Sequence, residues 1–206
     1  MHPRETGRRY DAIASFWDQQ RRESAQGVGF LERAIALCKW RERALDVGCG
    51  SGGPMIEKLL ATGFAVTGVD VSAALLTLAK ARYPTAEFVH DDITEWVTPR
   101  RYDLILAWDS IFHLPHGSHA PVIEKLCGYL AEHGVLLFTA GGVDGEIVGN
   151  MHGHEFAYSS LSATALMALV HRGGCVPVLV ERDQYPLHHL VVMAAKNLEA
   201  SASTRG

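Results

Sequence analysis

The sequence predicts an α/β fold in which helices cover both faces of a doubly wound, mostly parallel sheet. Short apolar segments alternate with helical patterns through the first two-thirds of the chain, as strands and crossover helices do in this class. Several of these segments are apolar on both faces, which is typical of strands that helices cover on both sides. Near the carboxyl end the alternation stops, and we expect one reversed strand there.

The elements expected in the first two-thirds are short and well separated. The first 40 residues have a helical pattern and precede the first expected strand. In the helix expected over 54–62, Met55, Ile56 and Leu59 lie on one face, as the helical period requires. A second helix is expected over 73–82, and the expected strands are 44–47, 65–70, 87–89, 102–108 and 134–140.

The last third of the chain departs from this alternation. We expect a helix over 162–171, followed by strands over 175–181 and 189–196. Residues 182–188 between these strands are too few to hold a crossover helix, so the strands should pair antiparallel. The glycine-rich residues 141–160 are expected to form a long loop over the carboxyl ends of the strands, a position that usually serves binding.

The composition is that of an ordinary globular protein. Of 206 residues, 48% are apolar and 20% are charged, and the formal net charge is -4. This length suits one domain, and without a basic excess a nucleic-acid partner is not expected. The sequence has no apolar segment of about 18 residues that could span a membrane, and its polar N-terminus does not resemble a signal peptide. We therefore expect a cytoplasmic monomer or homodimer with a small-molecule partner and no membrane or nucleic-acid partner.

A glycine-rich segment carries the chemical argument. Residues 46–53, Asp-Val-Gly-Cys-Gly-Ser-Gly-Gly, lie directly between an expected strand and an expected helix. Glycine lets the backbone turn sharply and approach a ligand, and the helix that follows offers free N–H groups. Asp70 ends the next strand, where a carboxylate can accept both hydroxyls of a ribose. The pattern indicates a cofactor of adenosine type across the carboxyl ends of the strands.

Two cofactor classes fit this geometry. Gly48, Gly50 and Gly53 satisfy the G-x-G-x-x-G pattern of NAD and FAD proteins. Asp46 lies two positions before the first glycine, where its carboxylate would repel a pyrophosphate and attract an ammonium group. The alternatives are therefore an enzyme whose cofactor carries an amine, and an NAD-type oxidoreductase or non-catalytic nucleotide-binding fold.

The same residues resemble the motifs of the class I S-adenosylmethionine-dependent methyltransferases. Residues 44–52 are similar to the first motif of this family, and residues 69–72 are similar to its ribose-binding motif. Asp92 matches the acid that contacts the adenine amine in the family, and residues 102–105 match its fourth strand. Residues 10–18, Tyr-Asp-Ala-Ile-Ala-Ser-Phe-Trp-Asp, are similar to the lid of its small-molecule members.

The resemblance implies a fold, a division of the chain and an activity. It implies a Rossmann-like sheet of seven strands in the order 3-2-1-4-5-7-6, with strand 7 antiparallel and helices on both faces. Residues 1–40 would form an N-terminal helical lid, residues 41–198 the methyltransferase core, and residues 199–206 a frayed tail. The implied reaction is in-line methyl transfer from S-adenosylmethionine to a small molecule (EC 2.1.1), which leaves S-adenosylhomocysteine.

The resemblance and the residue types together indicate a site. His113 and Asp109 follow the fourth strand, where the methyl group should point, and an unperturbed imidazole accepts a proton near neutral pH. The alternative for His113 is a buried structural histidine. The candidate cofactor-binding residues are Tyr10, Trp17, Asp46, Gly48, Cys49, Gly50, Asp70, Val71, Asp92, Ile93 and Trp108. The candidate acceptor-binding residues are His113, Met151, His152, Phe156 and His188.

A metal site is not expected. His113, His116 and His119 recur at a spacing of three, but a metal needs at least three ligands that converge on one point. Pro115 and Pro121 are expected to interrupt helix formation, so these histidines need not share a face. The four cysteines are far apart and form no C-x-x-C pair, which argues against a structural zinc site and a disulfide framework.

Overall fold

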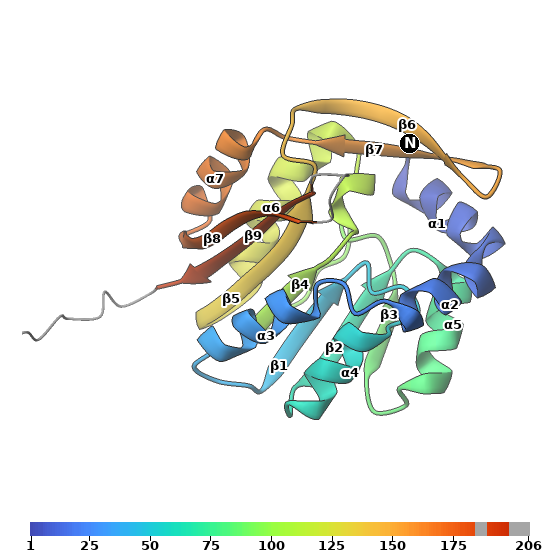
Figure 1. Cartoon of the computed structure of the whole chain (residues 1–206). Coiled ribbons are helices and arrows are strands. Elements are labelled where there is room, and N and C mark those ends of the chain that lie inside the picture. Colours follow the sequence, from blue (N-terminus) through green and yellow to red (C-terminus); the bar gives the residue numbers. More distant parts are fainter. Residues whose placement is uncertain (184–188, 198–206) are drawn as a thin grey trace, which may run out of the picture.

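The computed structural model describes residues 1–183 and 189–197, and it contains a seven-stranded sheet between two layers of helices (Figure 1). The strand order is β3-β2-β1-β4-β5-β9-β8. All pairs among the first five strands, β1 to β5, are parallel, whereas β9 pairs antiparallel with β5 and β8. The bounds are β1 (Arg43–Val47), β2 (Ala65–Asp70), β3 (Glu87–His90), β4 (Tyr102–Ala107), β5 (Leu130–Ala140), β8 (Cys175–Asp183) and β9 (His189–Lys196). Since β8 and β9 are the sixth and seventh strands of this sheet, the predicted order is confirmed.

Helices cover both faces of the sheet. One layer holds α3, α4 and α5, and the opposite layer holds α6 and α7, while α1 and α2 lie at one edge (Figure 1). The bounds are α1 (Pro3–Ala12), α2 (Ala14–Glu23), α3 (Val28–Leu37), α4 (Pro54–Ala61), α5 (Ala73–Arg82), α6 (His119–Tyr129) and α7 (Ala163–Arg172).

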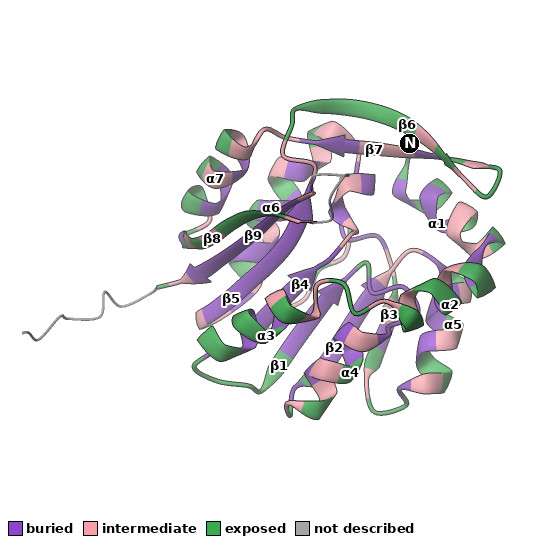
Figure 2. Cartoon of the chain, viewed as in Figure 1, coloured by how far each residue is buried: buried purple, intermediate pink, exposed green. Residues whose placement is uncertain are grey.

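Each face of the sheet has its own apolar core. Along β4, Leu104 and Leu106 pack under α3 and α4, while Ile105 packs on the other face under α6. This alternation explains why the strand is apolar at every position, and Figure 2 shows the central strands as buried. Full burial of one such side chain stabilises the fold by about 1.5–3 kcal/mol.

The segment after β5 forms a hairpin. Strands β6 (Gly145–Met151) and β7 (His154–Ser160) pair antiparallel above the main sheet (Figure 1). The turn between them places His152 at φ 51° and Gly153 at φ 80°, the left-handed conformations that two-residue hairpin turns require. The prediction of a loop over 141–160 is therefore wrong for most of the segment.

The region between β4 and α6 contains two short 3₁₀ helices, η1 (Ile111–His113) and η2 (His116–Ser118). Pro115 precedes η2, as expected of a residue that interrupts helices. Pro121, in contrast, lies in the first turn of α6, where the missing N–H would have no partner in any case. The prediction that Pro121 interrupts a helix is wrong.

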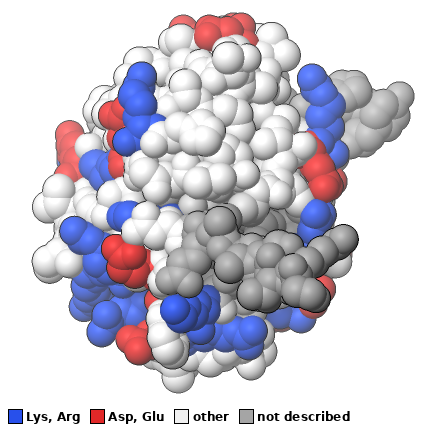
Figure 3. Space-filling model, turned by 90° about the vertical axis from the view of Figure 1, so that its left-hand side faces the viewer, with Lys and Arg blue, Asp and Glu red and all other residues white. Residues whose placement is uncertain are grey.

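The surface described by the structure carries charges of both signs. On the face shown in Figure 3, Lys and Arg side chains are interspersed with Asp and Glu around a broad area without charged groups. Within residues 1–183 and 189–197, none of the helices combines the length and the apolar character that crossing a membrane requires.

Candidate functional site

The glycine-rich loop after β1 is held in a conformation that other residues could not adopt easily. Gly48 has a φ of +71°, and a Cβ there would lie 2.2 Å from the Cβ of Ser110. The loop is tied to the end of β2, because the N–H of Gly50 donates to Oδ2 of Asp70 at 2.7 Å. The other oxygen of Asp70 accepts from the N–H of Ser72 at 2.8 Å. The loop and Asp70 therefore form one rigid wall.

Asp46 lies at the end of β1, in a cavity of about 100 Å³ beside this loop. The residue is buried, and its carboxylate makes no hydrogen bond to another residue of the described chain. Burial raises the pKa of Asp46 to about 7, against the opposing effect of Arg21, and Asp70 raises it further. A buried carboxylate without a partner is costly, so this position suits a ligand that brings a positive charge.

A second, smaller cavity continues from the first along the same edge of the sheet. It measures about 60 Å³ and shares Gly48, Asp70 and Ser110 with the first cavity. Val71 and Ile93 contribute to its apolar lining. The apolar part of this lining suits an apolar group of a ligand.

Asp92 supplies a hydrogen-bond acceptor to this smaller cavity. Its Oδ1 accepts from the N–H and the hydroxyl of Thr94, at 2.9 and 2.8 Å. Its Oδ2 is buried and has no partner. A ring with an amine donor would satisfy that oxygen.

The N-terminal helices cover both cavities. Oδ1 of Asp11 accepts from the hydroxyl of Ser72 at 2.6 Å and from the N–H of Ala74 at 2.9 Å. These bonds attach the end of α1 to the start of α5. Thr6 and Tyr10 of α1 and Trp17 and Arg21 of α2 line the larger of the two cavities.

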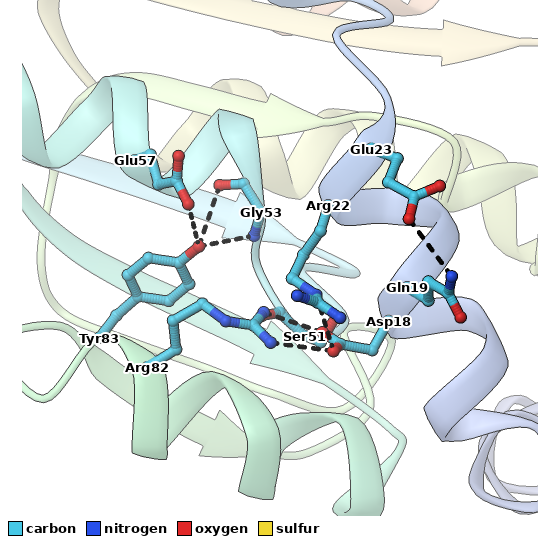
Figure 4. Close-up of polar contacts among 9 residues, drawn as sticks. All are labelled: Asp18, Gln19, Arg22, Glu23, Ser51, Gly53, Glu57, Arg82 and Tyr83. Atoms are coloured by element: carbon cyan, nitrogen blue, oxygen red, sulfur yellow. Dashed lines mark hydrogen bonds and ion pairs between the residues drawn. The ribbon is translucent and has the colours of Figure 1, made fainter.

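An ion pair attaches α2 to the outer side of the glycine-rich loop (Figure 4). Arg82 of α5 donates two hydrogen bonds to the carboxylate of Asp18, at 2.8 and 2.9 Å, and a third to the carbonyl of Ser51 at 3.2 Å. The two hydrogen bonds from Arg82 to Asp18 lower the pKa of Asp18. Next to Arg82, the hydroxyl of Tyr83 accepts from the N–H of Gly53 at 3.2 Å. The glycine-rich loop is thus held by α5 on its outer side and by Asp70 on its inner side.

A third cavity, of about 1030 Å³, adjoins the first. It lies between α2, the turn after β4 and the β6–β7 hairpin, and its lining includes several aromatic side chains. Its relevant lining residues are Tyr10, Trp17, Arg21, Asp109, Phe112, His113, Met151, Tyr158 and His189. A cavity of this size accommodates a drug-sized ligand.

His113 is buried between this cavity and the hairpin. Its Nδ1 lies 3.1 Å from the carbonyl oxygen of Ala157 and therefore carries the proton that it donates. Its Nε2, at 2.8 Å, accepts from the hydroxyl of Tyr10. Burial lowers the pKa of His113 to about 4, against the opposing effects of the Ala157 carbonyl and Asp109. Both ring nitrogens are engaged, and the ring is neutral near pH 7.

Asp109 lies where the first and third cavities meet. It has a φ of 51°, unusual for a residue other than glycine. Its N–H donates to Oγ1 of Thr139 at 2.7 Å, which helps to hold this conformation. Its Oδ2 lies 3.7 Å from Nη1 of Arg21, and its Oδ1 lies 3.3 Å from Nδ1 of His189.

The structure brings most of the predicted site residues together. Predicted residues that line the first cavity are Tyr10, Trp17, Asp46, Gly48, Cys49, Gly50, Asp70, Val71, Trp108, Asp109 and His113. Asp92 and Ile93 line the second cavity, and Met151 lines the third.

Two predicted acceptor residues of the described chain, His152 and Phe156, are not part of these linings. His152 packs on Phe16, with ring centroids 3.6 Å apart. Phe156 is fully buried, 4.9 Å from the ring of Tyr10. His188 lies outside the described residues. The structure therefore gives His152 and Phe156 packing roles in the cover of the site.

The predicted site residues do not include Arg21, Phe112, Tyr158 and His189, which are among the residues that line the third cavity. Arg21 lies one helical turn after Trp17, so its position was detectable from the helical period. Tyr158 and His189 are close in the sequence to predicted acceptor residues. Only the observed strand register shows that their side chains reach the cavity.

Comparison with known proteins agrees with this geometry. A family model described as a methyltransferase domain matches residues 44–134. A trans-aconitate 2-methyltransferase from Paracidovorax citrulli is 41% identical over 97 residues, which are 45% of this chain and 36% of that protein. The chain thus spans about a third of the length of the first curated relatives that it matches.

Solved structures extend the likeness to nearly the whole chain. An S-adenosylmethionine-dependent methyltransferase from Clostridium acetobutylicum has a TM-score of 0.70 at 13% identity, over 91% of this chain and 98% of that chain. A Burkholderia thailandensis 1,6-didemethyltoxoflavin-N1-methyltransferase, solved with its substrate and S-adenosylhomocysteine, has a TM-score of 0.66 at 22% identity, over 95% and 91%. Residues 44–134 therefore match a methyltransferase-domain model, and the chain has the fold of these solved S-adenosylmethionine-dependent methyltransferases.

Proposed function

We propose that the chain transfers the methyl group of S-adenosylmethionine to a small-molecule acceptor by in-line displacement. The observation that carries this proposal is Asp46, a buried carboxylate without a partner at the glycine-rich loop. The amino group of the cofactor is a cation that would neutralise it, whereas the pyrophosphate of a dinucleotide would be repelled. When bound, this cofactor supplies an activated methyl group on a sulfonium.

The chain's own residues fit the other parts of the cofactor. Asp70 has oxygen lone pairs left for the ribose hydroxyls beyond its two backbone bonds. Oδ2 of Asp92 is an unused acceptor for the adenine amine, between Val71 and Ile93. Arg21 lines the larger cavity and supplies a cation for the cofactor's carboxylate. Tyr10 and Trp17, in the proposed lid of residues 1–40, would exclude water from the sulfonium.

The acceptor occupies the 1030 Å³ cavity in this proposal. Its aromatic lining, with Phe112 and Tyr158, suits a planar or partly apolar molecule. Glu23, Asp144 and Glu146 also line it, and these carboxylates disfavour an acceptor with several negative charges. Trans-aconitate, which relatives of this chain methylate according to their names, is such a molecule.

His113 and Asp109 were the catalytic candidates, and the geometry favours different roles for them. His113 is engaged at both nitrogens, so we assign it to holding Tyr10 over the site. Asp109 faces both the cofactor cavity and the acceptor cavity. Positioning of the two reactants side by side supplies most of the acceleration of such a displacement.

Calorimetry on the full chain tests the cofactor assignment. S-adenosylmethionine should bind and NADH should not. Asp70→Ala should weaken binding by about 1.5–3 kcal/mol, the contribution of hydrogen bonds to a charged group. Asp144→Ala is the matched control, because Asp144 lines only the acceptor cavity. This variant should bind the cofactor with unchanged affinity. Tighter binding of NADH, or unchanged affinity in Asp70→Ala, would contradict the proposal.

A screen for S-adenosylhomocysteine release over a metabolite library then identifies the acceptor. The same preparation, examined by size-exclusion chromatography with light scattering, tests the expected monomer or homodimer. Cytoplasmic location and the absence of nucleic-acid partners stay predictions from the sequence.

A further inference from the structure

We propose that His189, supported by Asp109, accepts the proton of a hydroxyl acceptor, so that this chain methylates an alcohol or phenol rather than a carboxylate. The inference rests on the proposed function and adds to it the proton acceptor and the chemical class of the substrate.

The position of His189 supports this role. It is the first residue of β9 and lines the acceptor cavity, with 19% of its side chain exposed. Its ring centroid lies 5.4 Å from that of Phe112, which also lines the cavity. With Nδ1 beside Asp109, Nε2 is the ring nitrogen left for an acceptor.

Asp109 is the charged group that lies beside the ring of His189. Oδ1 of Asp109 lies 3.3 Å from Nδ1, an ion-pair distance whenever the ring is protonated. Asp183 of β8 is the cross-strand partner of His189. The nearby cation is Arg21, which pairs with the other oxygen of Asp109 at 3.7 Å. Asp109 is therefore placed to stabilise the imidazolium that proton transfer to His189 creates.

His113 cannot take this role in the observed arrangement. Its Nδ1 donates to the carbonyl of Ala157, and its Nε2 already accepts from Tyr10. A proton from the acceptor would first have to displace Tyr10. His189 has no such competing bond from another described residue at its cavity side.

The proposed step conserves atoms and charge. The hydroxyl proton moves to Nε2 of His189, and an oxygen lone pair of the acceptor forms the new bond to the methyl carbon. The carbon–sulfur bond of the sulfonium breaks, and its electron pair stays on the sulfur as a thioether. The imidazolium of His189 then releases its proton to solvent.

This chemistry separates two classes of acceptor. A hydroxyl group arrives protonated and needs a base, whereas a carboxylate is ionised near pH 7 and needs none. A base that lines the acceptor cavity beside Asp109 is therefore of use only to the first class. The cavity lining also favours a hydroxyl acceptor over a carboxylate, because its own carboxylates disfavour an anion. These are Glu23, Asp144 and Glu146.

The first experiment needs no acceptor. Histidine signals of the ¹⁵N-labelled full chain, bound to S-adenosylhomocysteine, report the surroundings of each ring nitrogen. In Asp109→Asn, the ¹⁵N signal of Nδ1 of His189 should shift, because the carboxylate 3.3 Å away is replaced by an amide. The exposed His171 of α7 serves as the control, and its signals should not change. An unchanged Nδ1 signal for His189 would overturn the pairing with Asp109.

The second experiment measures methyl transfer to 4-nitrophenol, 4-ethylphenol, tyramine and benzyl alcohol, with trans-aconitate as the carboxylate probe. His189→Gln should lower turnover of the un-ionised hydroxyl probes by about 10²–10⁴-fold, and should affect the largely ionised 4-nitrophenol much less. His171→Gln is the control and should retain full turnover. Added imidazole should restore turnover in His189→Ala, a rescue that a merely structural role would not give.

The outcomes separate this inference from the proposed function. If S-adenosylhomocysteine does not bind the wild-type chain, the proposed function fails. If it binds, but trans-aconitate is methylated and the hydroxyl probes are not, the acceptor class is wrong. Equal turnover by His189→Gln and wild type on a hydroxyl probe would remove His189 as the base.

Discussion

Asp46 is the residue whose ionisation should control cofactor affinity. Its pKa of about 7 means that the carboxyl group is largely protonated at pH 6 and ionised at pH 8. Only the ionised form attracts the ammonium group of S-adenosylhomocysteine, and that amine itself loses its proton above about pH 8. We therefore expect affinity, measured by calorimetry, to rise from pH 6 to a maximum between pH 7 and 8.

Asp46→Asn provides the control for this prediction. The variant should bind about ten- to a hundredfold more weakly at pH 8, and the rise between pH 6 and 7 should disappear. In the free protein, ionisation of Asp46 has the opposite effect, because it lowers the stability of the fold. The pKa is raised from 3.8 on folding, so ionisation of Asp46 lowers stability as pH rises from about 4 to 7. Urea unfolding at pH 8 should show Asp46→Asn more stable than wild type by up to a few kcal/mol.

Residues of the cofactor site were predictable where their signal is local in the sequence. Gly48, Gly50 and Asp70 follow from a strand, a turn and a fixed spacing. Arg21 shares a helix face with Trp17, but the packing of α2 decides that this face lies at the cavity. His189 has no local signal, because the register of β9 brings it to the cavity. His113 has the residue type of a base, but its burial and its two hydrogen bonds are tertiary properties.

At the scale of elements, close packing of α1 on the end of β2 depends on Gly7. A Cβ at Gly7 would lie 2.3 Å from the carbonyl oxygen of Val71. We expect Gly7→Ala to displace α1, to destabilise the fold by about 1–3 kcal/mol, and to weaken binding of S-adenosylhomocysteine. Chemical unfolding and calorimetry measure the two effects.

Gly29 of α3 is the matched control for Gly7. It is also a helical glycine, but nothing lies within 4 Å of an added Cβ. Gly29→Ala should therefore leave cofactor affinity unchanged and stabilise the fold by about 0.5–1 kcal/mol, the difference in helix propensity. A destabilised Gly29→Ala, or a fully stable Gly7→Ala with wild-type affinity, would contradict this account of α1.

The ion pair between Asp18 of α2 and Arg82 of α5 should hold the proposed lid closed (Figure 4). Asp18→Ala should speed tryptic cleavage within residues 1–40 and weaken S-adenosylhomocysteine binding by about 1.5–3 kcal/mol. The pKa of Asp18 is lowered, so its contribution is complete above pH 4 and is lost as pH falls below that. In the wild-type chain, S-adenosylhomocysteine should protect this segment.

Glu32 and Lys58 form a control pair between α3 and α4, at 2.6 Å. Their pair is more exposed than that of Asp18 and Arg82, and exposed pairs contribute about 0–1 kcal/mol. Glu32→Ala should therefore leave the cleavage rate of residues 1–40 nearly unchanged. Equal cleavage of the wild-type chain with and without S-adenosylhomocysteine would show that α1 and α2 do not act as a lid.

The elements of the main sheet were predictable because each has a strong apolar pattern. Leu104, Ile105 and Leu106 alternate between two buried faces, so β4 is apolar throughout. The β6–β7 hairpin has no such pattern, because Ile147 and Val148 are largely exposed and glycine is frequent along it. Its pairing depends on the turn at His152 and Gly153 and on contacts with α1.

At the scale of the whole molecule, the cover of the site comes from two segments that are far apart in the sequence, the N-terminal helices and the β6–β7 hairpin. Arg9 of α1 donates to the carbonyl of Glu155 in β7, and Tyr10 packs on Phe156. The N-terminal helices and the hairpin thus meet above the carboxyl ends of the strands (Figure 1). The two cofactor cavities beneath them measure only about 100 and 60 Å³, so we expect this cover to move when the cofactor enters.

Tyr10, Trp17, Arg21, Asp109 and His113 line both the first cofactor cavity and the acceptor cavity. We therefore expect a ligand in either cavity to change the free energy of binding in the other. Such coupling is reciprocal: the factor by which the cofactor changes acceptor affinity equals the factor by which the acceptor changes cofactor affinity. The true acceptor should therefore change the affinity for S-adenosylhomocysteine, although this molecule has no methyl group to transfer.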